Sequence, residues 1–335
     1  MKIDDIDKID TQKIYEIYDK WPEIAQESFE RDSPKVDVKD IDHIVLAGTG
    51  GSGAIGDIIS AILSKTNIHV NVVKGYLLPK TVDENTLVVA TSVSGNTKET
   101  LTILQNAGSI SSKFIAFSSG GDIMKYSRKN NIPFYQIPQI HSPRASLPSF
   151  LYSMLNILQD VIPIRTDDVK QSIELLKKTR DLIYSQNLNE KNPSLSLAEW
   201  ITGIPVIYFP AGLIAAAIRF KNSLQENSKL HVITEDVIEA CHNGIVSWER
   251  SSNAQPILIE GTDDYVKTKE RWDILKDYFN GEKIEYKEIR SVKGGILSKI
   301  MNLNYLLDYS SIYHAILCKI DPTPVDAIDF VKRRL

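Results

Sequence analysis

In the first 140 positions of this 335-residue chain, short apolar runs alternate with longer stretches of helical spacing. The short runs are rich in β-branched and aromatic residues, which predicts strands. They cover residues 43–48, 69–75, 86–92, 113–119 and 133–138. Helical spacing covers residues 11–30, 54–65, 97–108 and 121–130. Alternation of this kind predicts a parallel sheet with helices on both faces.

The second half of the chain repeats this order. Helices are predicted at residues 150–158 and 167–184, and a new alternating series then begins. Its strands are predicted at 205–212, 229–235, 255–261 and 283–292, and its helices at 213–224, 266–279, 296–307 and 311–320. We interpret the chain as two α/β/α sandwich subdomains, each with a mainly parallel sheet. The first would span residues 1–150 and the second residues 151–335.

Composition limits the class of protein. A single hydrophobic core stops growing at about 250–300 residues, so this length suits two domains. The net charge is −4 and the longest basic run is residues 332–334, which is not the footprint of a nucleic-acid binder. No apolar run approaches the ~18 residues of a membrane span, and the amino end lacks an apolar signal core. Two cysteines, Cys241 and Cys318, suit a reducing compartment, so we expect a cytoplasmic protein.

Two polar turns follow predicted strands of the first half. The turn "GTGGSG", residues 48–53, has the glycine spacing of a dinucleotide-binding turn. The next strand, however, ends in Val73, Lys74 and Tyr76 instead of the acidic residue that would hold a ribose. Two alternatives remain: the glycines permit a tight turn and close helix packing, or they let the backbone of Gly50, Gly51 and Ser52 approach a ligand.

The second turn, "SVSGNT" at residues 92–97, carries more chemistry. Ser92, Ser94 and Thr97 bring hydroxyl groups to the start of a predicted helix, and Gly95 permits an unusual backbone angle. A plain N-cap needs one hydroxyl, whereas this turn supplies several. Hydroxyls together with the unpaired amides of a helix amino end make an anion site. We therefore predict that this turn binds phosphate.

The two turns, about forty residues apart on successive turns of a parallel sheet, resemble the sugar isomerase (SIS) domain. Three further motifs extend the resemblance along the chain: "SPRASLP" (142–148), "FKNSLQENSK" (220–229) followed by "CHNGIVSWE" (241–249), and the terminal "DPTPV" with its downstream lysine. The whole pattern resembles the archaeal-type bifunctional phosphoglucose/phosphomannose isomerases. That resemblance implies metal-free interconversion of glucose 6-phosphate and mannose 6-phosphate with fructose 6-phosphate through a cis-enediol.

The resemblance also implies roles for individual residues. Glu226 would be the base that shuttles the proton between C2 and C1, and Arg144 would stabilise the enediolate oxygens. His242, supplied by the partner subunit of a homodimer, and Lys332 would open the sugar ring. Thr323 would leave room for both C2 epimers.

One position departs from the family pattern, because relatives usually carry an acidic residue soon after the His-Asn pair, where this chain has Gly244. The six histidines never fall at close ligand spacing, so no metal and no cofactor are expected. Two other functions stay open: a non-catalytic phosphosugar-binding regulatory protein, and an aminosugar-phosphate isomerase or deaminase. Glu226 and the ring-opening pair distinguish an enzyme from a sensor.

Overall fold

The computed structural model describes residues 1–108 and 111–335, which form two compact units. Unit 1 contains residues 1–19 and 171–331, and unit 2 contains residues 20–170 and 332–335. Both units are discontinuous in sequence. No helix in the described part of the chain is both long enough and apolar enough to cross a membrane.

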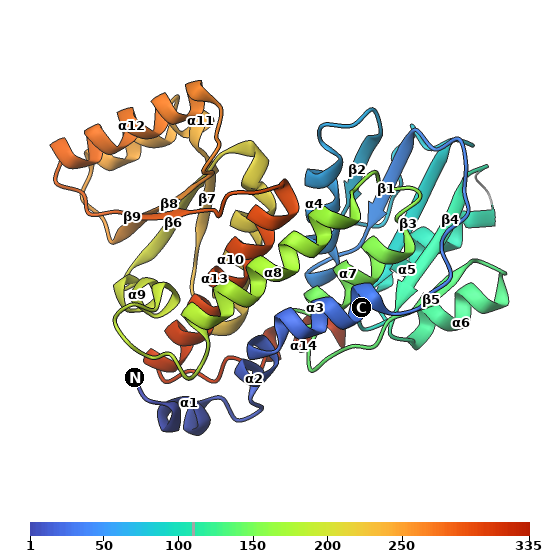
Figure 1. Cartoon of the computed structure of the whole chain (residues 1–335), viewed down its shortest axis with the longest axis horizontal. Coiled ribbons are helices and arrows are strands. Elements are labelled where there is room, and N and C mark those ends of the chain that lie inside the picture. The colour runs from blue at the N-terminus through green and yellow to red at the C-terminus, as the bar shows by residue number, and fades with distance from the viewer. Residues whose placement is uncertain (109–110) are drawn as a thin grey trace. The chain divides into compact units, whose positions relative to one another are not determined.

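Unit 2 is built on a parallel sheet with the order β2-β1-β3-β4-β5 (Figure 1). Its strands are β1 (His43–Ala47), β2 (His69–Val73), β3 (Thr86–Ser92), β4 (Lys113–Ser118) and β5 (Phe134–Gln136). Its helices are α3 (Trp21–Glu30), α4 (Gly51–Leu63), α5 (Lys98–Gln105), α6 (Gly121–Lys129) and α7 (Leu147–Ile157), with the 3-10 turn η1 (Asn106–Gly108). The chain order reverses between β1 and β3, so the turns after these two strands lie side by side.

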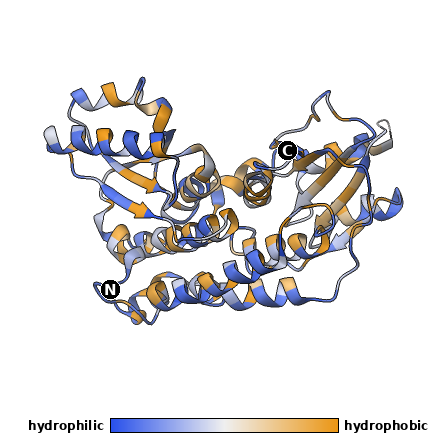
Figure 2. Cartoon of the chain, turned by 45° about the horizontal axis from the view of Figure 1, so that its top comes forward, coloured by the Kyte–Doolittle hydropathy of each residue, from blue (hydrophilic) through white to orange (hydrophobic). Residues whose placement is uncertain are grey.

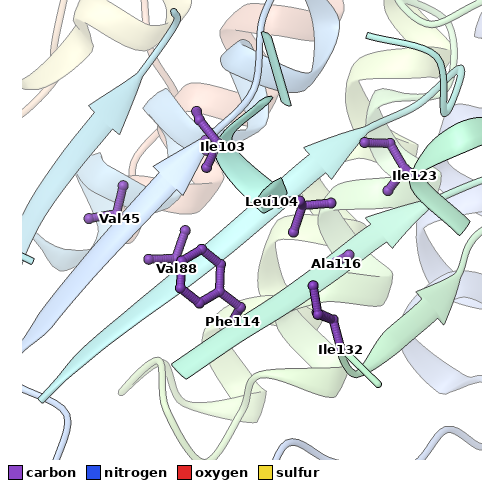
Figure 3. Packing of buried hydrophobic residues seen from close by; sticks show 10 residues of the cluster. Val45, Val88, Ile103, Leu104, Phe114, Ala116, Ile123 and Ile132 are labelled. Carbon is purple, nitrogen blue, oxygen red and sulfur yellow. The ribbon is translucent and has the colours of Figure 1, made fainter. Parts of the chain in front are cut away.

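Alternate residues of the buried strands face opposite layers of helices. Val45, Val88 and Phe114 belong to one core cluster with Leu104 of α5 and Ile123 of α6 (Figure 3). The opposite face of the sheet receives α4. Gly56 permits this approach, because a Cβ there would lie only 3.3 Å from the Cβ of Leu46. Unit 2 is therefore a three-layer α/β/α sandwich, as the sequence pattern predicted.

Unit 1 repeats the architecture with a parallel sheet of order β7-β6-β8-β9. Its strands are β6 (Ile204–Phe209), β7 (Ile233–Asp236), β8 (Ala254–Glu260) and β9 (Lys287–Arg290). Its helical elements are α1 (Ile3–Ile9), α2 (Ile14–Asp19), α9 (Pro193–Trp200), η2 (Ala211–Leu213), α10 (Ile214–Ser228), α11 (Val237–Ala240), η3 (Gly244–Glu249), α12 (Val266–Gly281) and α13 (Ile296–Leu317). The central strands of both sheets are largely hydrophobic, whereas the edge strands β7 and β9 carry charged residues and outer helices such as α12 carry both kinds of residue (Figure 2). Two helices, α8 (Thr166–Ile183) and α14 (Asp326–Lys332), contribute residues to both units.

Two predicted helices differ from the observed ones. The helix expected over residues 11–30 is interrupted before Trp21, and it continues as α2 and α3. Pro22 has no amide hydrogen for the carbonyl oxygen of Tyr18, which instead accepts a hydrogen bond from the Tyr305 hydroxyl at 2.6 Å. In the other case, the two helices expected at 296–307 and 311–320 are the single helix α13. The separate helices α1 and α9 had not been predicted.

Candidate active site

The turn after β3 is closed by its own side chains. Ser92 is fully buried; its hydroxyl oxygen accepts a hydrogen bond from the Gly95 amide at 3.1 Å and lies 2.8 Å from the Thr97 hydroxyl. Gly95 has φ +76°, and a Cβ there would lie 2.6 Å from the carbonyl carbon of Gly120. Only glycine fits a position with both properties. The backbone of the predicted phosphate turn is thus fixed before any ligand arrives.

The outer side of this turn presents hydrogen-bond donors. Ser94 and Thr97 are half-buried, and α5 begins directly after Thr97. Thr97 occupies the N-cap position, but its side chain makes no hydrogen bond to the helix amides. The first amides of α5 therefore keep their donors at the positive end of the helix dipole. Such an end can bind a phosphate group, with the Ser94 and Thr97 hydroxyls beside it.

The glycine turn after β1 lies against the neighbouring loops. The buried Ser52 hydroxyl accepts a hydrogen bond from the Val93 amide at 3.0 Å, which ties the first turn to the second. Gly50 adopts φ +56°, and a Cβ on Gly51 would lie 3.1 Å from the carbonyl oxygen of Pro143. Three loops therefore meet at the carboxyl edge of the unit 2 sheet, where ligands bind in open parallel sheets.

Arg144 lies in the third of these loops. Its side chain is only 6% exposed, and the loop around it is held by hydrogen bonds on both sides. The Ser146 hydroxyl accepts from the Ile140 amide at 2.8 Å, and the Trp21 indole donates to the carbonyl oxygen of Ala145 at 3.1 Å. The structure thus brings a buried guanidinium into the loop that contacts Gly51.

The position of Lys74 argues against the alternative of a dinucleotide site. This residue follows β2, where a ribose-binding acid would be expected. Its Nζ pairs with Asp57 of α4 at 2.6 Å, and its Cε would lie 3.2 Å from a Cβ on Gly53. A lysine stem therefore covers the start of α4. A Cβ on Gly53 would also lie 2.9 Å from the carbonyl oxygen of Gly48, so the third glycine of the motif serves close packing against backbone and side chain.

In unit 1, the end of α10 carries Glu226 on a firmly anchored turn. The Asn227 side-chain Nδ2 donates to the Ser311 hydroxyl at 2.8 Å, and the Ser228 hydroxyl donates to the Ser311 carbonyl oxygen at 2.7 Å. Lys229 ends the helix in the left-handed region, with φ +57°. Glu226 itself is half-buried. The residues that surround Glu226 in "QENSK" thus fix the helix turn from which its carboxylate projects.

A buried ion pair holds the same helix one to two turns earlier. Arg219 of α10 is 3% exposed and donates to the Asp308 carboxylate of α13 at 3.0 Å. Asp308 also accepts from the Ser223 hydroxyl at 2.6 Å and from the Tyr18 hydroxyl at 3.1 Å. Burial lowers the pKa of Arg219. The neighbouring Asp308 above all, together with Tyr18 and Glu226, raises it by more, so the pKa lies above its ordinary value and the guanidinium stays charged.

This cluster was missed at the sequence level. The signal was available, because Asp308 is the one acidic residue in the apolar segment 296–317. Such a residue is buried only when it is paired.

His242 is exposed and lies in the turn that follows α11. Its amide donates to the carbonyl oxygen of Glu239 at 2.9 Å. The Asn243 side chain bridges the turn, since its oxygen accepts from the Gly244 amide at 2.6 Å and its nitrogen donates to Glu239 at 3.1 Å. At Gly244 the backbone lies against the carboxyl group of Glu235.

The remaining predicted residues lie near the carboxyl terminus. Thr323 is 9% exposed, and its amide donates to the Asp321 carboxylate at 3.0 Å. The Lys229 ammonium contacts the carbonyl oxygens of both Glu226 and Pro324, which places the Thr323 segment beside the end of α10. Lys332 is the last residue of α14 and is exposed.

The predicted residues of unit 1 lie at opposite edges of its sheet. In a parallel sheet, α10 must run from the carboxyl edge at β6 back to the amino edge, where β7 begins. Glu226, near the end of this 15-residue helix of about 22 Å, therefore lies toward the amino edge. His242 follows the carboxyl end of β7 and lies toward the other edge. One unit does not bring Glu226 and His242 together.

Two family models match this chain. Residues 38–142 match the SIS domain, and residues 190–335 match the model described as bacterial phospho-glucose isomerase C-terminal SIS domain. A solved structure with a similar fold is the C-terminal domain of glucosamine-fructose-6-phosphate aminotransferase from Francisella tularensis. It has a TM-score of 0.67 at 15% identity, over 91% of this chain and 96% of that one. The fold and the turns thus define an SIS-domain protein.

Full-length relatives narrow this class. A bifunctional phosphoglucose/phosphomannose isomerase from Caldicellulosiruptor bescii is 34% identical, over 94% of this chain and 96% of the relative. Another of the same name, from Aquifex aeolicus, is 29% identical over 94% of each chain. The chain belongs to the family of bifunctional phosphoglucose/phosphomannose isomerases, which confirms the predicted resemblance.

Proposed function

We propose that this protein interconverts glucose 6-phosphate and mannose 6-phosphate with fructose 6-phosphate. The observation that carries the proposal is the turn after β3, whose rigid backbone presents uncapped helix amides and two hydroxyls in a member of this isomerase family. Binding the phosphate at a fixed point holds the sugar in one orientation, so that a base can act on the same carbon atoms in every turnover.

We assign the proton transfer to Glu226. Its carboxylate would remove the C2 proton of the open-chain aldose, which gives a cis-enediolate. It would then return this proton to C1 while the hydroxyl proton on O2 passes to O1, which forms the ketose. The Arg144 guanidinium would stabilise the negative oxygens of the intermediate. Thr323 would line the space around C2, where the glucose and mannose epimers differ. No metal or cofactor is required in this scheme, since the proton is only moved between neighbouring carbons.

Ring opening comes before this step and is assigned to His242 and Lys332. The topology of unit 1 supports a homodimer in which His242 reaches a site from the partner subunit, because Glu226 and His242 of one chain lie toward opposite sheet edges. An imidazole is suited to exchanging a proton with a sugar hydroxyl near neutral pH. Each active site would then need groups from two chains.

A coupled assay of fructose 6-phosphate formation from each aldose tests the assignment. Glu226→Gln removes the charge and keeps the shape, so we expect kcat to fall at least about a hundredfold on both sugars. Glu282→Gln, an exposed substitution at the end of α12, is the matched control and should retain full activity. Full activity of the Glu226 variant would contradict the role of this base. Binding of fructose 6-phosphate by the wild type without turnover would instead support a regulatory phosphosugar-binding protein.

A further inference from the structure

Glu235, at the carboxyl end of β7, carries a half-buried carboxyl group that the scheme above does not use. Among residues 1–108 and 111–335 this group has no hydrogen-bond or ion-pair partner. Burial raises the pKa of Glu235, and the nearby Glu239 carboxylate raises it further. Because burial of an unpaired acidic group costs stability, such a residue is a candidate for a functional role.

The carboxyl group of Glu235 lies directly against Gly244, two residues after His242. A Cβ added to Gly244 would lie 2.6 Å from the carboxyl carbon of Glu235, well inside van der Waals contact. A side chain at position 244 and the present position of Glu235 therefore exclude each other. The acidic group from β7 occupies the volume into which a side chain at position 244 would project.

Other contacts fix the two ends of the same turn. On one side, the His242 amide is bonded to the Glu239 carbonyl, and Asp236 caps α11 by accepting from the Ile238 amide at 2.8 Å. On the other side, the Trp248 indole donates to the Tyr208 hydroxyl at 2.8 Å. The contact between Glu235 and Gly244 lies between these anchors. At this contact the carboxyl group of a strand residue lies against the backbone of the turn that carries His242.

We propose that Glu235 is a positioning residue for ring opening. Its carboxylate comes from β7 and lies against the turn that carries His242. The inference rests on the proposed function of His242. The missing side chain of Gly244 leaves room for an acidic group from the neighbouring strand. The Glu235 carboxyl group lies beside the turn that carries His242, so both its volume and its charge bear on the surroundings of that side chain. The same contact keeps the backbone of the turn in one conformation.

Substitution of Glu235 separates charge from shape. In Glu235→Gln the volume stays and the charge is lost, so we expect kcat for glucose 6-phosphate to fall by about ten- to a hundredfold. KM should change less than about twofold, since the phosphate turn is untouched. Glu249→Gln, which removes an exposed charge from the same segment, is the control and should keep both constants. Urea unfolding of each variant shows whether the fold is kept.

An acidic side chain at position 244 can supply the carboxylate in place of Glu235. Glu235→Ala combined with Gly244→Glu returns an acidic group to the vacated volume, so kcat should rise at least tenfold above that of Glu235→Ala alone. Wild-type kcat in Glu235→Gln, or no recovery in the double variant, would overturn the inference. A wild-type protein that turns over neither aldose would contradict the proposed function and remove this inference with it. An active wild type with an unaffected Glu235→Gln variant contradicts this inference alone.

Discussion

Hydroxyl groups at the carboxyl edge of the unit 2 sheet are of two kinds. Ser52 and Ser92 are buried and bond to backbone amides of the turns, whereas Ser94 and Thr97 are half-buried on the outer side. All four had been predicted to contact the ligand. A sequence shows that hydroxyls are clustered, but not which of them face inward, because that depends on the backbone angle at Gly95. Removal of an inner hydroxyl should therefore cost stability, and removal of an outer one should weaken phosphate binding.

Gly95 is the residue on which the shape of the phosphate turn depends most. Gly95→Ala combines a left-handed backbone angle with a clash against Gly120, so we expect a loss of roughly 1–3 kcal/mol in the free energy of unfolding and a raised KM. Gly75→Ala is the matched control, since a Cβ there would meet no atom within 4 Å. Urea unfolding and steady-state kinetics measure the two effects. Equal stability of both variants would contradict this account of the turn.

His314 makes the stability of unit 1 depend on pH. It is 5% exposed on α13, and burial lowers its pKa below the ordinary value of 6.5. As pH falls through about 6.5, this histidine binds a proton in the unfolded chain but not in the folded protein. The free energy of unfolding therefore falls by up to about 1.4 kcal/mol per pH unit. Unfolding in urea at pH 7.5 and 5.5 should show a smaller loss for His314→Asn than for the wild type. His231→Asn, at an exposed position, should behave as the wild type does, and an unchanged loss in His314→Asn would contradict the assignment.

At the scale of elements, strands were predicted better than helices. Each of the nine predicted strands overlaps an observed one. The central strands are buried and nearly continuously apolar, as parallel strands usually are, whereas the edge strands β7 and β9 carry charged residues. The run at 229–235 yields only β7, since Lys229 still caps α10. Helix α13 was predicted as two helices with a gap at residues 308–310, yet the hydroxyls of Ser310 and Ser311 donate to carbonyl oxygens of the same helix, at 3.0 and 2.6 Å. A buried helix without a polar face offers no periodicity to read.

The pair of Arg219 and Asp308 joins α10 to α13 and holds the helix that carries Glu226. Asp308→Asn leaves a buried guanidinium without its counter-charge, and we expect a loss of roughly 3–5 kcal/mol in unfolding free energy. Asp122→Asn breaks an exposed pair with Lys125 and should cost less than about 1 kcal/mol. The double variant Arg219→Met with Asp308→Leu should recover much of the stability. If Asp308→Asn were as stable as the control, the pair would not be the anchor of α10.

At the scale of the whole molecule, two sheets of equivalent strand order carry different chemistry. The order β2-β1-β3-β4 in unit 2 corresponds to β7-β6-β8-β9 in unit 1, as the internal repeat predicted. The turn after β8 nevertheless holds Asp264, which accepts from the Gly261 amide at 2.9 Å and the Trp272 indole at 3.1 Å. The hydroxyl turn thus has no counterpart there. Contacts between distant parts of the chain are not evident from the sequence pattern: Tyr18 bonds to residues 287 and 290 positions away.

Mixed dimers test whether each active site draws on two chains. Glu226→Gln and His242→Ala should each be inactive alone, because each lacks one essential group. In a hybrid dimer, one site pairs the intact Glu226 of one chain with the intact His242 of the other, whereas the second site has neither. A 1:1 mixture at exchange equilibrium should therefore regain about a quarter of wild-type activity per chain, since half of the dimers are hybrids. Mass spectrometry of differently tagged chains verifies the exchange. No recovery after proven exchange would mean that each site takes Glu226 and His242 from the same chain.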